Sequence, residues 1–176
     1  GSTITIIDWK KPGTMVYAIR YILERNYVHI SGDVTDAVFQ LTETATLENL
    51  AHYDLDYFMG KLCCMDNDNG IAFDSNLAQT TIQEYLKEAF DGCLDEKESE
   101  IIQVVLDAVQ DCTTKRNWEY ELAKLDEHYN LSTYFDEWYE WLPSCGDHYS
   151  FQAIACWMGL RMAYEQLKCN QKKENA

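Results

Sequence analysis

Between residues 46 and 168, apolar residues recur at spacings of three and four, the pattern of amphipathic α-helices. The pattern predicts helices at about 47–65, 77–93, 96–113, 118–129, 134–142 and 147–168. The short connection between the second and third makes them antiparallel neighbours. The last helix is apolar around most of its circumference, so we expect it to run through the core with Trp157 and Met158 deeply buried.

The first 45 residues follow a different pattern. Residues 3–9 and 27–31 are rich in β-branched side chains and are predicted to be strands. Between them, the apolar spacing predicts a helix that begins at a Thr14 cap and ends at about Arg25. Residues 34–41 fit either a third strand or a turn of helix. The expected fold class is α+β and mainly α, with a small N-terminal mixed α/β unit of two or three short strands packed on a bundle of about five or six helices.

A length of 176 residues is typical of one domain, and no linker rich in Pro, Gly or Ser divides the chain. Residues 1–2 are expected to be an expression-tag scar. We therefore expect a single domain over 3–170, with the small α/β portion at 3–45 and the helical portion at 46–170. A polar, frayed tail is expected at 171–176.

Cysteine usage and hydropathy indicate the compartment. The seven cysteines are an odd number and lack the paired spacing of a zinc site, so we expect reduced thiols and no cofactor. No apolar run approaches the ~20 residues needed to cross a bilayer, and no secretory signal opens the chain. A soluble, cytoplasmic protein is expected.

The charge of the chain is strongly negative, with 30 acids against 14 bases and a formal net charge of −16. Residues 31–100 hold sixteen acids and three bases, and residues 101–147 hold ten and three. Such a surface repels nucleic acid phosphates and anionic membranes and attracts basic protein surfaces. The expected partner is therefore the basic surface of a nucleic-acid-binding protein or nuclease, with no direct binding to nucleic acid or membrane.

The stretch over 47–70 gathers a histidine, two adjacent cysteines and four aspartates. If Gly70 is the sixth position of an EF-hand loop, Met65 is the first, where that loop needs an acid, so the calcium pattern fails. His52, Asp56 and Cys63 fall near one helical face, but no second histidine lies nearby to complete a metal site. We interpret the stretch as an amphipathic helix with an acidic outer face.

The strongest catalytic candidates are Cys145 and His148, in SCGDHYS at a predicted loop-to-helix junction. A helix N-terminus lowers the pKa of a thiol, and Asp147 is placed to orient the histidine. Against catalysis, a nucleophile and its base usually come from distant segments, and Asp147 or Ser150 also fits a simple helix cap. Dinucleotide-binding, P-loop, serine-hydrolase and zinc-protease motifs do not occur in the sequence. We expect a protein that is not an enzyme.

The partner-binding carboxylates are expected on the outer faces of the helices between residues 46 and 113. The candidates are Asp54, Asp56, Asp66, Asp68, Glu84, Glu88, Asp91, Asp95, Glu96, Glu98 and Glu100.

The segments HISGDVTDAVFQL (29–41) and LDYFMGKLC (55–63) resemble uncharacterised proteins carried by bacteriophages and mobile elements. In size, acidity and aromatic content, the chain is also similar to phage proteins that inhibit host restriction or CRISPR systems, some of which imitate DNA. The resemblance implies a non-enzymatic inhibitor that acts in the cytoplasm of a bacterial host cell.

Three other functions fit the same sequence. They are an immunity protein that neutralises a toxin nuclease, a cysteine-dependent hydrolase at Cys145 and His148, and an assembly protein whose acidity only keeps it soluble. Exposed aromatic residues also make a homodimer compatible with the sequence.

Overall fold

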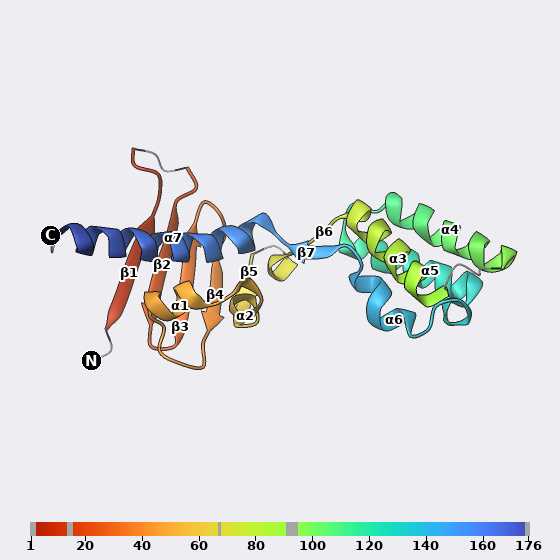
Figure 1. The fold of residues 1–176 in the computed structure, drawn as a ribbon, viewed down its shortest axis with the longest axis horizontal. Helices are drawn as coiled ribbons and strands as arrows, with labels where there is room; N and C mark the ends of the chain where they lie inside the picture. The colour runs from red at the N-terminus through yellow and green to blue at the C-terminus, as the bar shows by residue number, and fades with distance from the viewer. Residues whose placement is uncertain (1–2, 14–15, 67, 91–94, 175–176) are drawn as a thin grey trace. The chain divides into compact units, whose positions relative to one another are not determined.

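The computed structural model describes residues 3–13, 16–66, 68–90 and 95–174 (Figure 1). The chain divides into two compact units. The first combines Gly1–Ile71 with Tyr149–Ala176, and the second is the intervening segment Ala72–His148. The second unit is therefore inserted into the sequence of the first, a division that differs from the expected portions at 3–45 and 46–170.

The first unit is built on a five-stranded antiparallel sheet whose strands pair in chain order. They are β1 (Ile4–Trp9), β2 (Ile19–Glu24), β3 (Tyr27–Gly32), β4 (Ala37–Gln40) and β5 (Leu62–Met65). In β2, Ile19, Tyr21 and Leu23 are buried while the residues between them point to the opposite face. One face of the sheet therefore carries the core.

The prediction of two or three short strands in a mixed α/β unit is wrong, because the sheet has five strands and all its pairings are antiparallel. The segment predicted to be a helix ending at Arg25 forms β2 instead. Its apolar residues fit both the 3.6-residue period of a helix and the two-residue period of a strand. Pairing with β1 and β3 on its two sides selects the extended form. Arg25, with φ of 53°, lies in the tight turn to β3. The predicted Thr14 cap lies outside the described residues.

The prediction of one helix over 47–65 is also wrong. The structure has α1 (Leu47–His52) and α2 (Leu55–Met59), followed by β5. Tyr53 and Asp54 are extended between the two helices, and the Asp54 side chain caps α2 by accepting a hydrogen bond from the Tyr57 N–H at 2.7 Å. The Asp54 cap therefore divides the predicted long helix into two short ones.

Helix α7 (Phe151–Glu174) crosses one face of the sheet, as Figure 1 shows. The prediction that Trp157 and Met158 are deeply buried is wrong, because Trp157 is half-buried and Met158 is 42% exposed. Only one face of the helix packs on the sheet. Its buried residues are Ala153, Cys156, Gly159, Leu160 and Ala163. The helix continues through residues 171–174 of the expected tail.

Tyr21 joins the sheet to α7 inside this core. Its hydroxyl donates a hydrogen bond to the Cys156 carbonyl at 3.0 Å, and burial raises the pKa of the phenol, which stays protonated. Gly159 makes room for the ring, since a Cβ at that position would lie 2.1 Å from the Tyr21 hydroxyl oxygen. The contact therefore requires glycine in the middle of a helix.

The second unit is helical. It contains α3 (Ser75–Phe90), α4 (Glu96–Gln110), α5 (Lys115–Tyr129) and the short α6 (Trp138–Trp141). The helices predicted at 77–93, 96–113 and 118–129 correspond to α3, α4 and α5. Trp118 is fully buried in their core, and its indole N–H donates to the Leu142 carbonyl at 2.9 Å.

Two short strands, β6 (Ile71–Phe73) and β7 (Asp147–Tyr149), pair with each other. They contain the two points at which the chain passes from one unit to the other. Among the described helices, none combines the length and apolarity needed to cross a membrane.

We predict that Gly159→Ala destabilises the protein, although the same change in an ordinary helix interior is favourable by about 1 kcal/mol. The added methyl group collides with the Tyr21 hydroxyl, so a loss of about 1–3 kcal/mol is expected. Urea unfolding followed by tryptophan fluorescence measures the change. Met158→Ala, at an exposed neighbouring position, is the control with a small effect, and a stabilised Gly159→Ala variant would contradict the packing described here.

Candidate partner-binding surface

The negative charge of the protein is concentrated in the second unit. Residues 72–148 contain 18 acids and 5 bases, a net charge of −13, whereas the first unit contains 12 acids and 9 bases, a net charge of −3. Among the described residues of the second unit, ion pairs engage only two of these acids. Lys115 pairs with Asp147, and Lys124 pairs with Glu121 at 2.8 Å. Most of the charge is therefore not neutralised within the unit.

Helix α4 carries four exposed carboxylates on one face: Glu96, Glu100, Asp107 and Asp111, the last at its C-cap. Their spacings of four, seven and four residues keep them within one side of the helix. The opposite face packs into the core through Ile101, Ile102, Val105, Leu106 and Val109. At 1.5 Å per residue, the acidic face extends for about 22 Å.

Two other predicted contact acids have a structural role at the start of the same helix. The Asp95 carboxylate accepts a hydrogen bond from the Glu98 N–H at 2.7 Å, and the Glu98 carboxylate accepts one from the Asp95 N–H at 2.9 Å. This reciprocal pair is a capping box. Asp95 and Glu98 are therefore used in starting the helix, whereas Glu96 and Glu100 remain exposed.

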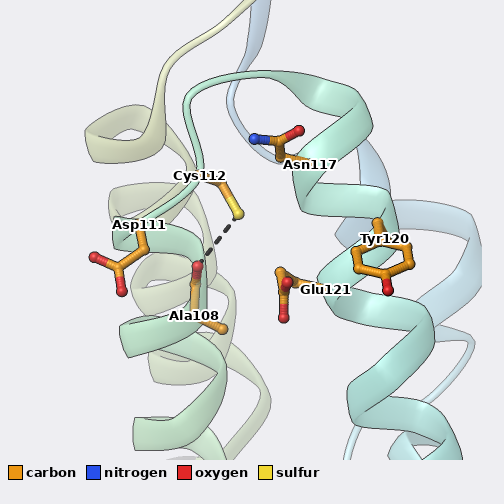
Figure 2. Close-up of a pocket in the computed structure, with 6 residues that line it drawn as sticks. All are labelled: Ala108, Asp111, Cys112, Asn117, Tyr120 and Glu121. Atoms are coloured by element: carbon orange, nitrogen blue, oxygen red, sulfur yellow. Dashed lines mark hydrogen bonds between the residues drawn. The ribbon is translucent and has the colours of Figure 1, made fainter.

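A hollow of about 420 Å³ lies between α4 and α5 (Figure 2). It is lined by Ala108, Asp111, Cys112, Asn117, Tyr120 and Glu121. Figure 2 shows Glu121 directed into the gap between the helices and Asp111 directed away from α5. The Glu121 carboxylate in this hollow is paired with Lys124, so it adds little free negative charge to the end of α4.

The thiol in this hollow is not suited to nucleophilic chemistry. Cys112 is buried, and its thiol donates to the Ala108 carbonyl at 3.3 Å. Burial raises the pKa of Cys112, as do the nearby carboxylates of Glu121 and Asp111. The thiol therefore remains protonated near neutral pH.

The remaining predicted acids lie in both units. Glu84 and Glu88 are exposed on α3, while Asp91 lies outside the described residues. In the first unit, Asp54 is the α2 cap described above, and Asp56 accepts a hydrogen bond from the Tyr149 hydroxyl at 2.8 Å.

Asp66 is exposed after β5, and the Asp68 side chain is outside the described part of the structure. The predicted acidic surface is therefore divided between two units, with its strongest described element on α4.

The catalytic candidates do not form a nucleophile and base pair in the described residues. Cys145 is buried, its thiol donates to the Trp141 carbonyl at 3.6 Å, and burial raises its pKa to about 11, with a further contribution from Asp147. His148 is exposed, with Nδ1 3.3 Å from the Gly146 carbonyl oxygen. Asp147 pairs with Lys115. This environment favours the neutral thiol, the opposite of what a cysteine nucleophile needs.

Metal ligands are not gathered in the described residues, where no group of three or more His, Cys, Asp or Glu side chains is arranged to hold an ion. No known protein family, curated protein or solved structure matches the chain. The most prominent chemical feature of the described residues is the charged face of α4.

Some exposed acids of the second unit were not among the predicted contacts. They include Asp107, Asp111, Glu119 and Glu127. The spacing from Glu96 to Asp111 is visible in the sequence, and extending the acidic helix face through its last turn would have included both aspartates.

We predict that Asp95→Ala destabilises the second unit by about 1 kcal/mol, because it removes the capping hydrogen bond to the Glu98 N–H. Glu96→Ala removes a neighbouring exposed acid and is expected to change the free energy of unfolding by less than about 0.5 kcal/mol. Chemical denaturation of the two variants measures the difference. Equal effects would show that Asp95 acts only through its charge.

Alkylation of the folded protein tests the state of the thiols. Iodoacetamide at neutral pH is expected to modify the exposed Cys63, Cys64 and Cys169 and to leave the buried Cys112, Cys145 and Cys156 unmodified. Peptide mass spectrometry identifies the modified positions, and the denatured protein gives the full-modification control. Preferential labelling of Cys145 would show that its thiol is accessible and reactive, and would support the hydrolase hypothesis.

Proposed function

We propose that the protein is an acidic, non-enzymatic inhibitor encoded by a phage or mobile element. Its target is the basic, nucleic-acid-binding surface of a host defence nuclease of the CRISPR or restriction type, in the bacterial cytoplasm. The observation that carries the proposal is the net charge of −13 on the second unit, with four exposed carboxylates on one face of α4.

The mechanism is competition for a site that normally binds nucleic acid. Carboxylates on α4 occupy the places of phosphates in a basic channel, and the attraction speeds association with the target. The exposed rings of Tyr120 (64%) and Tyr139 (60%) add contact area in the same unit. A mimic of this kind needs no catalytic group.

The charge density of DNA indicates how many carboxylates a nucleic-acid mimic has to present. One strand of B-DNA carries a charge about every 3.4 Å of helix axis, or about six over the 22 Å of the α4 face. Four carboxylates on α4 supply part of that number. The other exposed acids of the unit, including Glu84 and Glu88 on α3 and Glu119 on α5, are available to supply the rest.

The acids whose side chains cap a helix N-terminus contribute less to this surface. Asp95 and Glu98 start α4, and Asp54 starts α2. A partner that drew these carboxylates away would weaken the helices that present the others. The contact set of the proposal is therefore Glu96, Glu100, Asp107 and Asp111.

We predict that neutralising this set, by Glu96→Gln, Glu100→Gln, Asp107→Asn and Asp111→Asn together, weakens binding to the target by about tenfold or more. The assay measures binding to a panel of purified CRISPR effectors and restriction nucleases at low and high salt. Binding of the unchanged protein is expected to compete with nucleic acid and to weaken as salt rises, because salt screens exposed charges.

The matched control removes the same charge from the first unit, through Glu24→Gln, Asp33→Asn, Asp36→Asn and Glu165→Gln. It is expected to retain most of the binding. Equal losses in the two variants would mean that only net charge matters, and binding to none of the panel would end the proposal. Capture of a toxin nuclease by the protein would instead support the immunity hypothesis.

A further inference from the structure

The two edges of the five-stranded sheet differ in how they are protected against pairing with another strand. The edge strand β5 has four residues, and its pairing with β4 is irregular between Val38 and Phe39. The other edge strand, β1, has six residues in unbroken register with β2. Its sequence, ITIIDW, contains no Pro or Lys, the residues that commonly block an edge.

Two of the three residues on the exposed face of β1 are apolar, and the third is Asp8. Ile4 is 52% exposed and Ile6 is 59% exposed, and both lie on the sheet face opposite α7. The register with β2 places Ile7 and Trp9 on the other face, opposite Tyr21 and Ile19. A strand added beside β1 would therefore find apolar neighbours on both faces of the sheet.

Helix α7 extends over this edge. Figure 1 shows its C-terminal turns continuing past β1, the last strand on that side of the sheet. A hollow of about 310 Å³ lies between the two elements, lined by Ile6, Ile7, Asp8, Trp9, Ala163, Gln166, Leu167 and Asn170. Leu167 is 48% exposed above it. The helix thus covers a place where the sheet has no further strand.

We infer that the β1 edge binds the β1 strand of a second copy of this chain, in an antiparallel pair related by a two-fold axis. Opposed residues in such a pair point to the same face, so a register centred on Ile6 places Ile4 opposite the Asp8 of the second copy. Thr5 then lies opposite Ile7, and no two like charges face each other. Each α7 covers the β1 of the other copy through Leu167.

The charges of the first unit permit this contact. Its net charge is −3, whereas contacts between second units would oppose two charges of −13. Asp8 on the edge strand is already paired with Arg20 on β2 at 2.7 Å. Self-association is therefore expected through the sheet edge and not through the acidic helices.

The contact is small. The six residues of β1 and the exposed turns of α7 after Ala163 are somewhat fewer than the 20–30 residues a side of a standard interface. The dimer is accordingly expected to form and dissociate with protein concentration. This inference does not rest on the proposed inhibitor function, because the edge and the acidic helices are in different units.

Sedimentation equilibrium over a wide concentration range tests the dimer. The unchanged protein is expected to approach twice the chain mass of 20.5 kDa at high concentration. Ile4→Lys with Ile6→Lys places charges on the edge and is expected to leave only the monomer. The control, Val16→Lys, adds a charge at a position that is 62% exposed outside the strand and is expected to remain dimeric.

Amide hydrogen exchange gives a test that needs no variant. Among residues 4–9, the amides that point away from β2 are expected to become protected as concentration rises, while those of residues 19–24, already inside the sheet, keep the same protection. A mass of 20.5 kDa at every concentration, a dimer that survives the lysine substitutions, or unchanged exchange at residues 4–9 would each overturn the inference.

Discussion

The packing of α7 on the sheet is the interaction on which the first unit depends. The helix comes from the C-terminal end of the chain, and the strands come from the N-terminal end. Tyr21 joins them through its hydrogen bond to the Cys156 carbonyl and its close approach to Gly159. A buried hydroxyl without a partner is costly, so the bond and the glycine together specify where α7 crosses the sheet.

This arrangement lets a separate helical unit occur in the middle of the sequence. The second unit has its own core around Trp118, and its two connections to the first unit lie in the paired strands β6 and β7. A core of its own means that its outer faces are free to carry charge. The near-neutral unit holds the sheet, and the inserted unit holds most of the acids.

Helices α3, α4 and α5 were predictable because their apolar repeat has only one consistent solution. Residues 101–109 place five buried side chains on one face of α4, and acids take the other. The pattern in residues 16–23 is different, because apolar residues there match both a helix and a strand. Long-range pairing with β1 and β3 decides that segment, and a local pattern contains no information on such pairing.

The sequence predicted that the candidate site is acidic. It was less successful in predicting which acids are exposed and which have a structural role. Asp95 and Glu98 have the spacing of a capping box, so their structural role was visible in the sequence. The apolar outer face of α7 was not predictable as exposed, because Met158 has the same chemistry as a core residue. Only the position of the sheet tells which side of that helix is covered.

The charge on the second unit has a cost in folding free energy. A net charge of −13 in one compact unit opposes folding through self-repulsion, and in the described residues the pairs of Lys115 with Asp147 and of Lys124 with Glu121 offset only part of it. Solubility alone is met by a net charge magnitude of about 2–8 on a small domain. The second unit exceeds that range, with four of its exposed acids on one face of α4, and this excess is the reason for which we propose a basic partner.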